Sequence, residues 1–225
     1  MTVETRGGTI AVVEVLGLPG SGKTTVVDAI SRSPSVEVMS RYRSPSNVFP
    51  YAMEAFKLLP VLVPSLWQGR SWRERNKLIR LASSGSIVRQ RARGTTARAF
   101  VFDQGPLFLL KQLSADAGPP DAIERRRRRL ASAWARTLDL ALVLDAPDDV
   151  LLERIRGRDK GHQLRGEPDG PARIALASER HCIERLLGEL AVEGAVRVHR
   201  VDTSTSAVAD TAAALLRGVR VVATT

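Results

Sequence analysis

The residues with the clearest chemical potential form a glycine-rich segment near the amino terminus, which reads Gly17-Leu18-Pro19-Gly20-Ser21-Gly22-Lys23-Thr24. The segment fits the pattern G-x-x-x-x-G-K-[ST] at every fixed position. Glycines let such a loop curl so that successive backbone N–H groups face phosphate oxygens, and a following helix adds the positive end of its dipole. We therefore expect a phosphate-binding loop whose nucleotide contacts are Gly17, Pro19, Gly20, Ser21, Gly22, Lys23, Thr24 and Thr25.

This pattern, the Walker A motif, predicts ATP and Mg²⁺ as cofactors. Lys23 is placed to bridge the β- and γ-phosphates, and the Thr24 hydroxyl is placed to bind the metal. Asp103 ends the apolar run at residues 99–103, where a parallel sheet presents its carboxyl end to the same crevice. A carboxylate there can hold magnesium and can accept a proton from an acceptor hydroxyl. The alternative for Asp103 is a polar residue that caps a strand.

Two arginines further along the chain are candidates for stabilising a transferring phosphoryl group. Arg154 and Arg158 are four residues apart near the end of a helix predicted over residues 147–158, so both fall on one face. A basic helix terminus favoured by the helix dipole is the alternative. The glycine-rich, charged residues that follow indicate a mobile lid, over about residues 154–171. Arg41 and Arg43 are the candidates for binding an acceptor.

The elements that must position these residues alternate along the chain. Short β-branched or apolar runs predict strands, and helix-length segments lie between them. Such alternation implies parallel strands joined by crossover helices, with the working site at the carboxyl ends of the strands. The predicted strands are residues 9–16, 36–39, 99–103, 140–145 and 196–201, and the predicted helices are residues 23–33, 71–93, 119–138, 147–158, 172–190 and 206–217.

Length and composition indicate one globular domain over residues 1–225, with 44% hydrophobic residues. The net charge of +10 favours partners that carry phosphate. Arginines 125–129 wrap around a helix, so a solvated face is favoured and a nucleic-acid patch is the alternative. Cys182 is the only cysteine, which excludes an internal disulfide and suits the cytoplasm.

Charged residues and prolines interrupt the apolar stretch at residues 51–67, so no membrane partner is expected. Trp67, Trp72, Phe49 and Tyr51 are expected in the core, with a base-stacking pocket wall as the alternative.

Three segments together resemble a known family. GLPGSGKTT, VFDQGP and VLDAPDDVLLERIRGRDKG, in this order and spacing, are similar to the nucleoside and nucleotide kinases of the thymidylate kinase and deoxynucleoside kinase group, over about residues 10–216. The resemblance implies a three-layer α/β P-loop fold, with a five-stranded parallel sheet, helices on both faces and a mobile lid. It implies that Asp103 is the family's strand-end acid, that Arg154 and Arg158 are lid arginines, and that residues 201–206 pack against adenine.

The chain departs from this family at the acceptor end, because Gln104 follows Asp103 where an arginine is usual. The leading expectation is an ATP-dependent kinase whose partner is a small-molecule acceptor, foremost a nucleoside or nucleotide. A polynucleotide or a non-nucleotide metabolite is the alternative acceptor, and a homodimer is a further option. A regulatory nucleotide switch fits less well, because Pro106 stands three residues after Asp103 where such proteins carry glycine.

Overall fold

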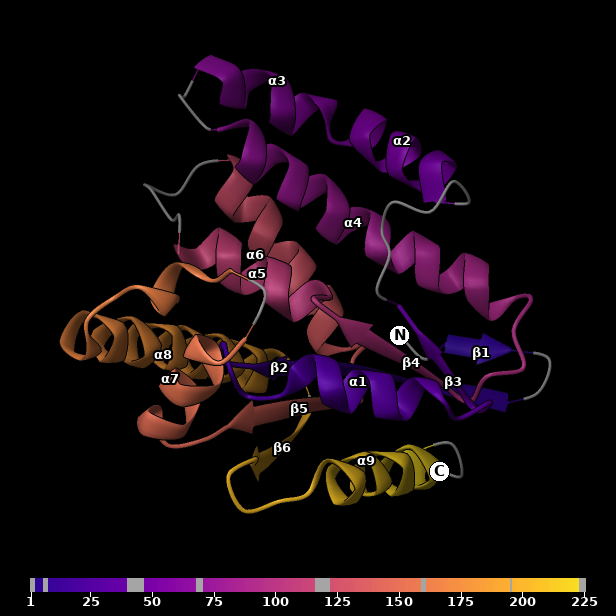
Figure 1. Cartoon of the computed structure of the whole chain (residues 1–225). Helices are drawn as coiled ribbons and strands as arrows, with labels where there is room; N and C mark the ends of the chain where they lie inside the picture. The colour runs from indigo at the N-terminus through magenta and orange to yellow at the C-terminus, as the bar shows by residue number, and fades with distance from the viewer. Residues whose placement is uncertain are drawn as a thin grey trace.

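A parallel sheet runs through the middle of the molecule in the computed structural model, which describes residues 3–5, 8–39, 47–67, 71–115, 122–158, 161–194 and 196–222. Its strand order is β3-β4-β2-β5-β6, and neighbouring strands are parallel (Figure 1). The strands are β2 (Gly8–Gly17), β3 (Val36–Val38), β4 (Ala99–Asp103), β5 (Leu140–Asp145) and β6 (Arg197–Asp202). A short additional strand, β1 (Val3–Thr5), pairs with the start of β2 in the antiparallel direction.

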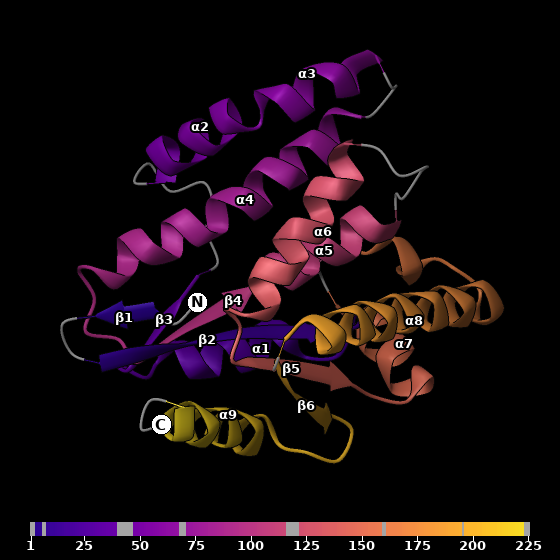
Figure 2. The ribbon, with the colours of Figure 1, turned by 180° about the vertical axis from the view of Figure 1, so that it is seen from behind.

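Helices cover both faces of this sheet, as Figures 1 and 2 show from opposite sides. One face carries α1 (Lys23–Ser31) and α9 (Val208–Val222), which pack against each other. The other face carries α4 (Trp72–Ala92), α5 (Pro106–Ala115), α6 (Ala122–Ala135), α7 (Asp148–Arg156) and α8 (Asp169–Glu193). An outer layer over α4 consists of α2 (Val48–Lys57) and α3 (Leu59–Trp67), and a single 3-10 turn, η2 (Gln163–Arg165), lies between α7 and α8.

The central strand β2 supplies side chains to two separate cores. Successive residues of a strand point to opposite faces. Val13 and Val15 therefore pack with α1 and α9, whereas Val12 and Leu16 join the larger core beneath α4 to α8. Glu14 lies between Val13 and Val15 in sequence, so its carboxylate points into the larger apolar core.

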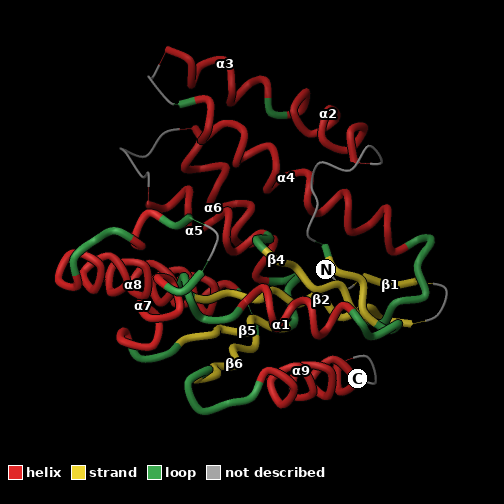
Figure 3. The backbone as a smooth tube through the Cα atoms, in the orientation of Figure 1, coloured by secondary structure: helices red, strands yellow, loops and turns green. Residues whose placement is uncertain are grey.

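The three-layer α/β fold confirms the fold expected from the sequence, including the five parallel strands (Figure 3). The predicted bounds of β4 and β5 agree with the structure, and β6 begins one residue later than predicted. The sequence patterns did not predict β1, α2, α3 or α5.

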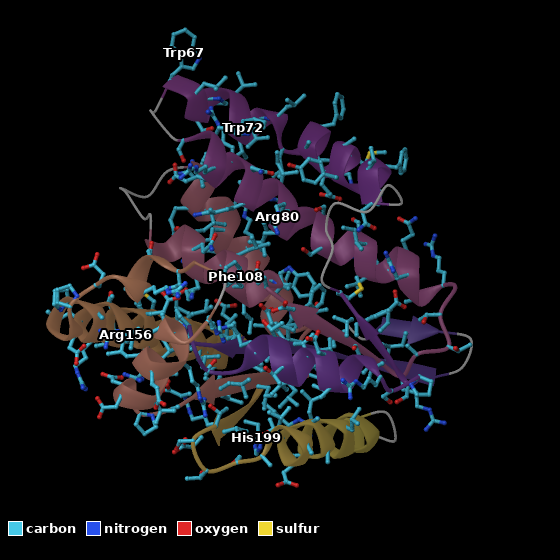
Figure 4. The ribbon with its side chains drawn as sticks, viewed as in Figure 1. Trp67, Trp72, Arg80, Phe108, Arg156 and His199 are labelled. Carbon is cyan, nitrogen blue, oxygen red and sulfur yellow. The ribbon has the colours of Figure 1, made fainter. Side chains whose placement is uncertain are left out.

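Four aromatic residues were expected in the core, and the expectation is wrong for three of them, whereas Tyr51 is partly buried against the larger core. Trp67, Trp72 and Phe49 have 90%, 67% and 73% of their surface exposed. Phe49 and Trp67 belong to α2 and α3, which form the outermost layer and pack inward on one side only, and Trp72 is the first residue of α4. Figure 4 shows Trp67 projecting from the end of α3, away from the body of the molecule.

The arginine run on α6 divides by helical position. Arg125, Arg128 and Arg129 are exposed, as expected for a helix face in contact with solvent. Arg127 is buried and contradicts it, because its guanidinium donates to Glu124 at 2.7 and 2.9 Å and to Glu189 of α8 at 3.1 Å. This residue therefore joins two helices of the core face.

Candidate nucleotide-binding site

The glycine-rich loop lies between the end of β2 and the start of α1, as the sequence predicts. Gly17, Gly20 and Gly22 all have positive φ, at 155°, 85° and 81°. A Cβ on Gly17 would lie 2.4 Å from the Leu144 carbonyl oxygen, and a Cβ on Gly20 would lie 2.7 Å from the Leu151 carbonyl oxygen. Both positions therefore require glycine for space as well as for backbone conformation.

Gly22 caps the amino terminus of α1 without a side-chain hydrogen bond, so the first N–H groups of the helix are available to a ligand. The Ser21 hydroxyl is buried within the loop and has no hydrogen-bond partner in the structure. A buried hydroxyl without a partner is unfavourable in an empty protein, and a phosphate oxygen can satisfy it. Thr24 and Thr25 are exposed on the first turn of α1, next to this loop.

Lys23 folds back across the loop. Its ammonium group donates to the carbonyl oxygens of Gly17 at 2.6 Å and Leu18 at 2.9 Å. The pKa of Lys23 is lowered to about 8, chiefly by burial and also by the charges of Lys111 and Arg158, whereas the carboxylates of Asp103 and Glu179 act in the opposite direction. The ammonium group therefore lies within the electrostatic reach of cations and anions from four other elements or loops.

Asp103 lies at the carboxyl end of β4, directly beside Val15 of β2. Its carboxylate is half-buried, and burial raises its pKa, while Lys23 lowers it and Asp28 raises it. Asp103 and Lys23 thus face the same space, as expected for a strand-end acid next to a phosphate-binding loop. A raised pKa makes a carboxylate a better proton acceptor.

The two candidate arginines occupy different environments. Arg154 is on α7, and its guanidinium donates to the Thr203 hydroxyl at 3.0 Å and the Thr203 carbonyl at 2.9 Å, with a longer contact of 3.5 Å to the Gly20 carbonyl. The predicted helix over residues 147–158 ends earlier, at Arg156, so the expectation that both arginines share one helix face is wrong for Arg158. Gly157 ends the helix, yet the charge of Arg158 still reaches Lys23.

A cleft of about 580 Å³ opens beside the glycine loop. The loop, α1, α7 and the segment after β6 all contribute to its walls. Arg154 and Thr203, which hydrogen-bond to each other, both line it, as does Ser206. Its volume lies in the range of small-molecule sites. The segment at residues 201–206, expected from the family resemblance to pack against adenine, therefore lies beside the loop that is expected to hold phosphate.

The sequence patterns did not single out one buried acid near this site, Glu14. Glu14 is fully buried, and its carboxylate accepts hydrogen bonds from the backbone N–H groups of Leu107 at 2.7 Å and Phe108 at 2.9 Å. These N–H groups belong to the first turn of α5, whose dipole favours a negative charge there. Burial nevertheless raises the pKa of Glu14 to about 8, against the effect of these N–H groups. A single charged residue inside the apolar run 10–16 was the available signal.

Glu14 also explains the unusual turn after Asp103. Gln104 has φ of 59°, a left-handed conformation that is uncommon for residues other than glycine. The following Gly105 has no room for a side chain, because a Cβ would lie 2.4 Å from the Cβ of Phe102 and 2.9 Å from Oε2 of Glu14. The chain therefore turns tightly at Gln104 and Gly105 so that α5 can begin against the Glu14 carboxylate.

Asp145, which also ends a strand, is engaged elsewhere. Its carboxylate accepts from Arg180 of α8 at 2.7 and 3.1 Å and from its own neighbour, the Ala146 N–H, at 2.8 Å. Arg180 also donates to Asp148 at 3.0 Å. These contacts tie the end of β5 to α8.

The described part of the chain contains no group of three or more His, Cys, Asp or Glu residues that can hold a metal ion. Magnesium in phosphoryl-transfer sites is usually bound through one or two protein oxygens together with substrate phosphates. Thr24 and Asp103 fit that arrangement, and the unpartnered Ser21 hydroxyl fits a phosphate beside it. The predicted acceptor residues Arg41 and Arg43 lie outside the described residues.

Comparison with known proteins shows what kind of fold positions this site. No protein-family model and no curated protein sequence matches the chain. Among solved structures, the chain is similar to the deoxyadenosine kinase from M. mycoides with bound dCTP, with a TM-score of 0.54 and 14% identity over 93% of this chain and 99% of that one. The same kinase with bound dATP matches with a TM-score of 0.52 and 11% identity over the same shares. The chain therefore has the P-loop fold of a deoxynucleoside kinase.

Within the described residues, no helix is long and apolar enough to cross a lipid bilayer.

Proposed function

We propose that the protein is an ATP-dependent kinase that transfers the γ-phosphoryl group to a small-molecule acceptor, foremost a nucleoside or a nucleotide. The observation that carries this proposal is the convergence of four groups at the carboxyl end of the sheet. The glycine loop offers backbone N–H groups, Lys23 and Arg158 offer positive charge, and Asp103 offers a carboxylate within the electrostatic reach of Lys23. This combination matches the needs of phosphoryl transfer, which relies on positioning and charge stabilisation.

The phosphate end of ATP binds, in this proposal, to the loop from Gly17 to Thr25. Lys23 moves from the Gly17 and Leu18 carbonyl oxygens to the β- and γ-phosphates. Thr24 and Asp103 would hold Mg²⁺, which would neutralise phosphate charge when bound with the nucleotide. The adenine occupies the cleft beside the loop, next to Thr203.

Transfer then follows from the groups around Lys23. An acceptor oxygen forms a bond to the γ-phosphorus, the bond to the β–γ bridging oxygen breaks, and ADP leaves with that oxygen. The acceptor proton passes to Asp103, which lies at the carboxyl end of β4. Arg154 and Arg158 stabilise the negative charge on the phosphoryl group during the step. To do so, Arg154 must first break at least one of its hydrogen bonds to Thr203.

Several finer points belong to the same proposal. The chain works as a single domain over residues 1–225, with residues 154–171 as the lid. The thymidylate kinase-like subtype, a cytoplasmic location and a homodimer are retained as expectations. A nucleoside acceptor is supported by the fold shared with deoxyadenosine kinase. The position after Asp103 does not support it, because Gln104 is uncharged where the family usually has an arginine. A polynucleotide or non-nucleotide acceptor is the alternative.

An acceptor panel tests this function. The protein is incubated with Mg-ATP and with nucleosides, nucleoside monophosphates, non-nucleotide alcohols and short oligonucleotides, and products are detected by mass spectrometry. We expect one class of small acceptor to gain a phosphoryl group, and Lys23→Ala to abolish the product. Phosphorylation of oligonucleotides alone favours the polynucleotide alternative. Nucleotide binding that is unchanged in Lys23→Ala contradicts the assignment of the loop.

A further inference from the structure

The outer face of α2 and α3 is apolar along its whole length. The two helices follow each other along one edge of the molecule, on the far side of α4 from the sheet (Figures 1 and 2). Every exposed residue of these two helices other than Lys57 is apolar. The largest of them recur every three or four residues and so form one stripe, which we call the apolar ridge: Phe49, Met53, Phe56, Leu59, Val63 and Trp67.

Polar residues of the same helices point inward, which inverts the usual arrangement of a surface helix. Glu54 and Ser65 are buried, and the Glu54 carboxylate accepts from the Ser86 hydroxyl of α4 at 3.1 Å. Aromatic side chains have surfaces of about 150–250 Å² each, so those of the ridge alone expose roughly 400–500 Å². That already equals the largest apolar patch of a typical monomer, about 300–600 Å². A patch of this size marks an interaction surface.

The exposed charges at the ridge have one sign. Lys57 pairs with the buried Glu54 at 2.9 Å, yet 55% of its side chain stays exposed. Glu74, the other acid of this region, is also buried, and its carboxylate accepts from the Ser71 backbone N–H at 2.8 Å. The first two turns of α4 present basic residues that are exposed or half-buried, namely Arg73, Arg75 and Lys77. Among the described residues 47–67 and 71–77, no carboxylate is exposed.

This combination of groups fits the surface of an anionic bilayer. Aromatic side chains enter the boundary between headgroups and acyl chains, where tryptophan is enriched, and neighbouring basic residues contact anionic headgroups. Trp67 projects outward at one end of the ridge, and Figure 4 shows Trp72 near the same end. The Arg75 guanidinium lies 5.9 Å from the centre of the Trp72 ring, so a basic group accompanies this tryptophan.

A second copy of the chain fits the ridge less well. It would bring Lys57 and the basic first turns of α4 towards identical groups, and the ridge offers no exposed carboxylate to pair with them. The net charge of +10 on each chain adds to this repulsion. Anionic headgroups, in contrast, compensate both the local basic residues and the net charge.

We propose that the apolar ridge docks the protein on a lipid bilayer that carries anionic headgroups. The sequence-based expectation of no membrane partner rested on the lack of a spanning segment. A helix that lies in the bilayer interface needs no span, so the prolines and charges within residues 51–67 do not oppose docking. The proposal does not depend on the nucleotide site, and Lys23→Ala should dock as the wild type does.

Vesicle flotation of the full chain tests the proposal. We expect binding to vesicles of phosphatidylcholine with phosphatidylglycerol, weaker binding at raised ionic strength, and much weaker binding to phosphatidylcholine alone. The double variant Phe49→Ser, Phe56→Ser should lower the partition coefficient by at least about tenfold for each phenylalanine. Its matched control is Ile174→Ser, Val192→Ser, which changes two exposed apolar residues of α8 and should bind as the wild type.

A charge variant tests the role of the headgroups. Arg73→Gln should weaken binding to the anionic vesicles by about fivefold and leave binding to phosphatidylcholine unchanged. Arg93→Gln, at the other end of α4, removes the same charge away from the ridge and should have no such effect. An equal loss of binding in both variants overturns the assignment of the basic residues beside the ridge.

Tryptophan fluorescence provides a readout that needs no substitution. Of the three tryptophans, Trp134 is buried against Phe102, so a change on adding vesicles reports Trp67 and Trp72. We expect a blue shift with anionic vesicles and quenching by lipids with brominated acyl chains. An unshifted spectrum at saturating anionic lipid overturns the proposal.

Two further results also overturn it. One is equal vesicle binding by the wild type and Phe49→Ser, Phe56→Ser. The other, from sedimentation velocity without lipid, is a dimer of the wild type that the same variant converts to a monomer, which assigns the ridge to a second copy. If circular dichroism shows that the double variant is unfolded, Trp67→Ser replaces it, because this side chain projects away from the body of the molecule. Unchanged vesicle binding in Trp67→Ser then overturns the proposal, and a loss of about tenfold supports it.

Discussion

Glu14 should make the stability of the protein fall as pH rises through neutrality. Its carboxyl group is fully buried, and its pKa is raised from 4.5 to about 8. Between these two values the native state keeps the proton that the unfolded state has already released. Stability therefore decreases with rising pH over this window, and the decrease levels off as the pH passes above 8. At about 1.4 kcal/mol per pH unit, this residue alone lowers the free energy of unfolding by roughly 5 kcal/mol between pH 4.5 and 8.

The variant Glu14→Gln removes this titration while it keeps the shape of the side chain. Its amide oxygen can accept from one of the two N–H groups at the start of α5, so the variant should lose about 1–3 kcal/mol at pH 5, where the wild-type carboxyl is neutral. At pH 8 the Glu14 carboxyl of the native wild type is about half ionised, whereas the variant carries no charge there. The difference in stability should therefore shrink, or change sign, between pH 5 and pH 8.

Denaturant unfolding followed by circular dichroism at pH 5, 6, 7 and 8 measures this difference. The exposed carboxyl at the end of α8 provides a control, because Glu193→Gln should leave the pH dependence of the wild type unchanged. If the wild type and Glu14→Gln keep a constant difference in stability at all four pH values, Glu14 has the same charge throughout. The reasoning about its burial is then refuted, and the start of α5 must stabilise the carboxylate more strongly than burial opposes it.

Three further predictions concern the site itself. Affinity for Mg-ATP should fall by about tenfold from pH 7 to pH 9, because Lys23 with a pKa of about 8 must be protonated to bind phosphate. Titration calorimetry should show a weaker dependence of this affinity on pH in Lys23→Ala. Gly20→Ala should lower the melting temperature more than Gly22→Ala does. Both glycines have positive φ, but of the two only a Cβ at Gly20 would meet a carbonyl oxygen, that of Leu151. Gly22→Ala should cost about 1–2 kcal/mol of stability, and equal losses of stability in the two variants would contradict the contact at Gly20. Asp103→Asn should lower kcat by about 10²–10⁴, while the Kd for ATP measured without Mg²⁺ changes little, as rapid-quench and binding assays can determine. A normal kcat would remove Asp103 from the role of proton acceptor.

The sequence was sufficient for the features that depend on local spacing. The glycine pattern placed the loop between β2 and α1, and two apolar runs defined β4 and β5 to the residue. The end of α7 was misplaced because the charged run after Arg154 continues a helical pattern, whereas Gly157 ends the helix. The sequence patterns did not predict α5, because the pair Gly105 and Pro106 is typical of a loop, whereas in the structure Pro106 begins the helix.

Contacts between distant residues were beyond sequence patterns. Glu14 and the N–H groups that it binds are 93 and 94 residues apart, and Lys111 and its ion-pair partner Glu179 are 68 residues apart. Each pair depends on how whole elements pack, and a lone charge in an apolar run does not specify its partner. The exposed aromatic residues of α2 and α3 illustrate the same point, since an outer helical layer has the composition of a core element but only one covered side.

The fate of the γ-phosphoryl group of ATP tests the central claim most directly. The wild type and Lys23→Ala are supplied with Mg-ATP labelled at the γ-phosphate and with the best acceptor from the panel, and the label is followed into product and into inorganic phosphate. The account predicts stoichiometric transfer of label to the acceptor by the wild type and none by Lys23→Ala. Label that appears only as inorganic phosphate, or transfer that survives in Lys23→Ala, would contradict it.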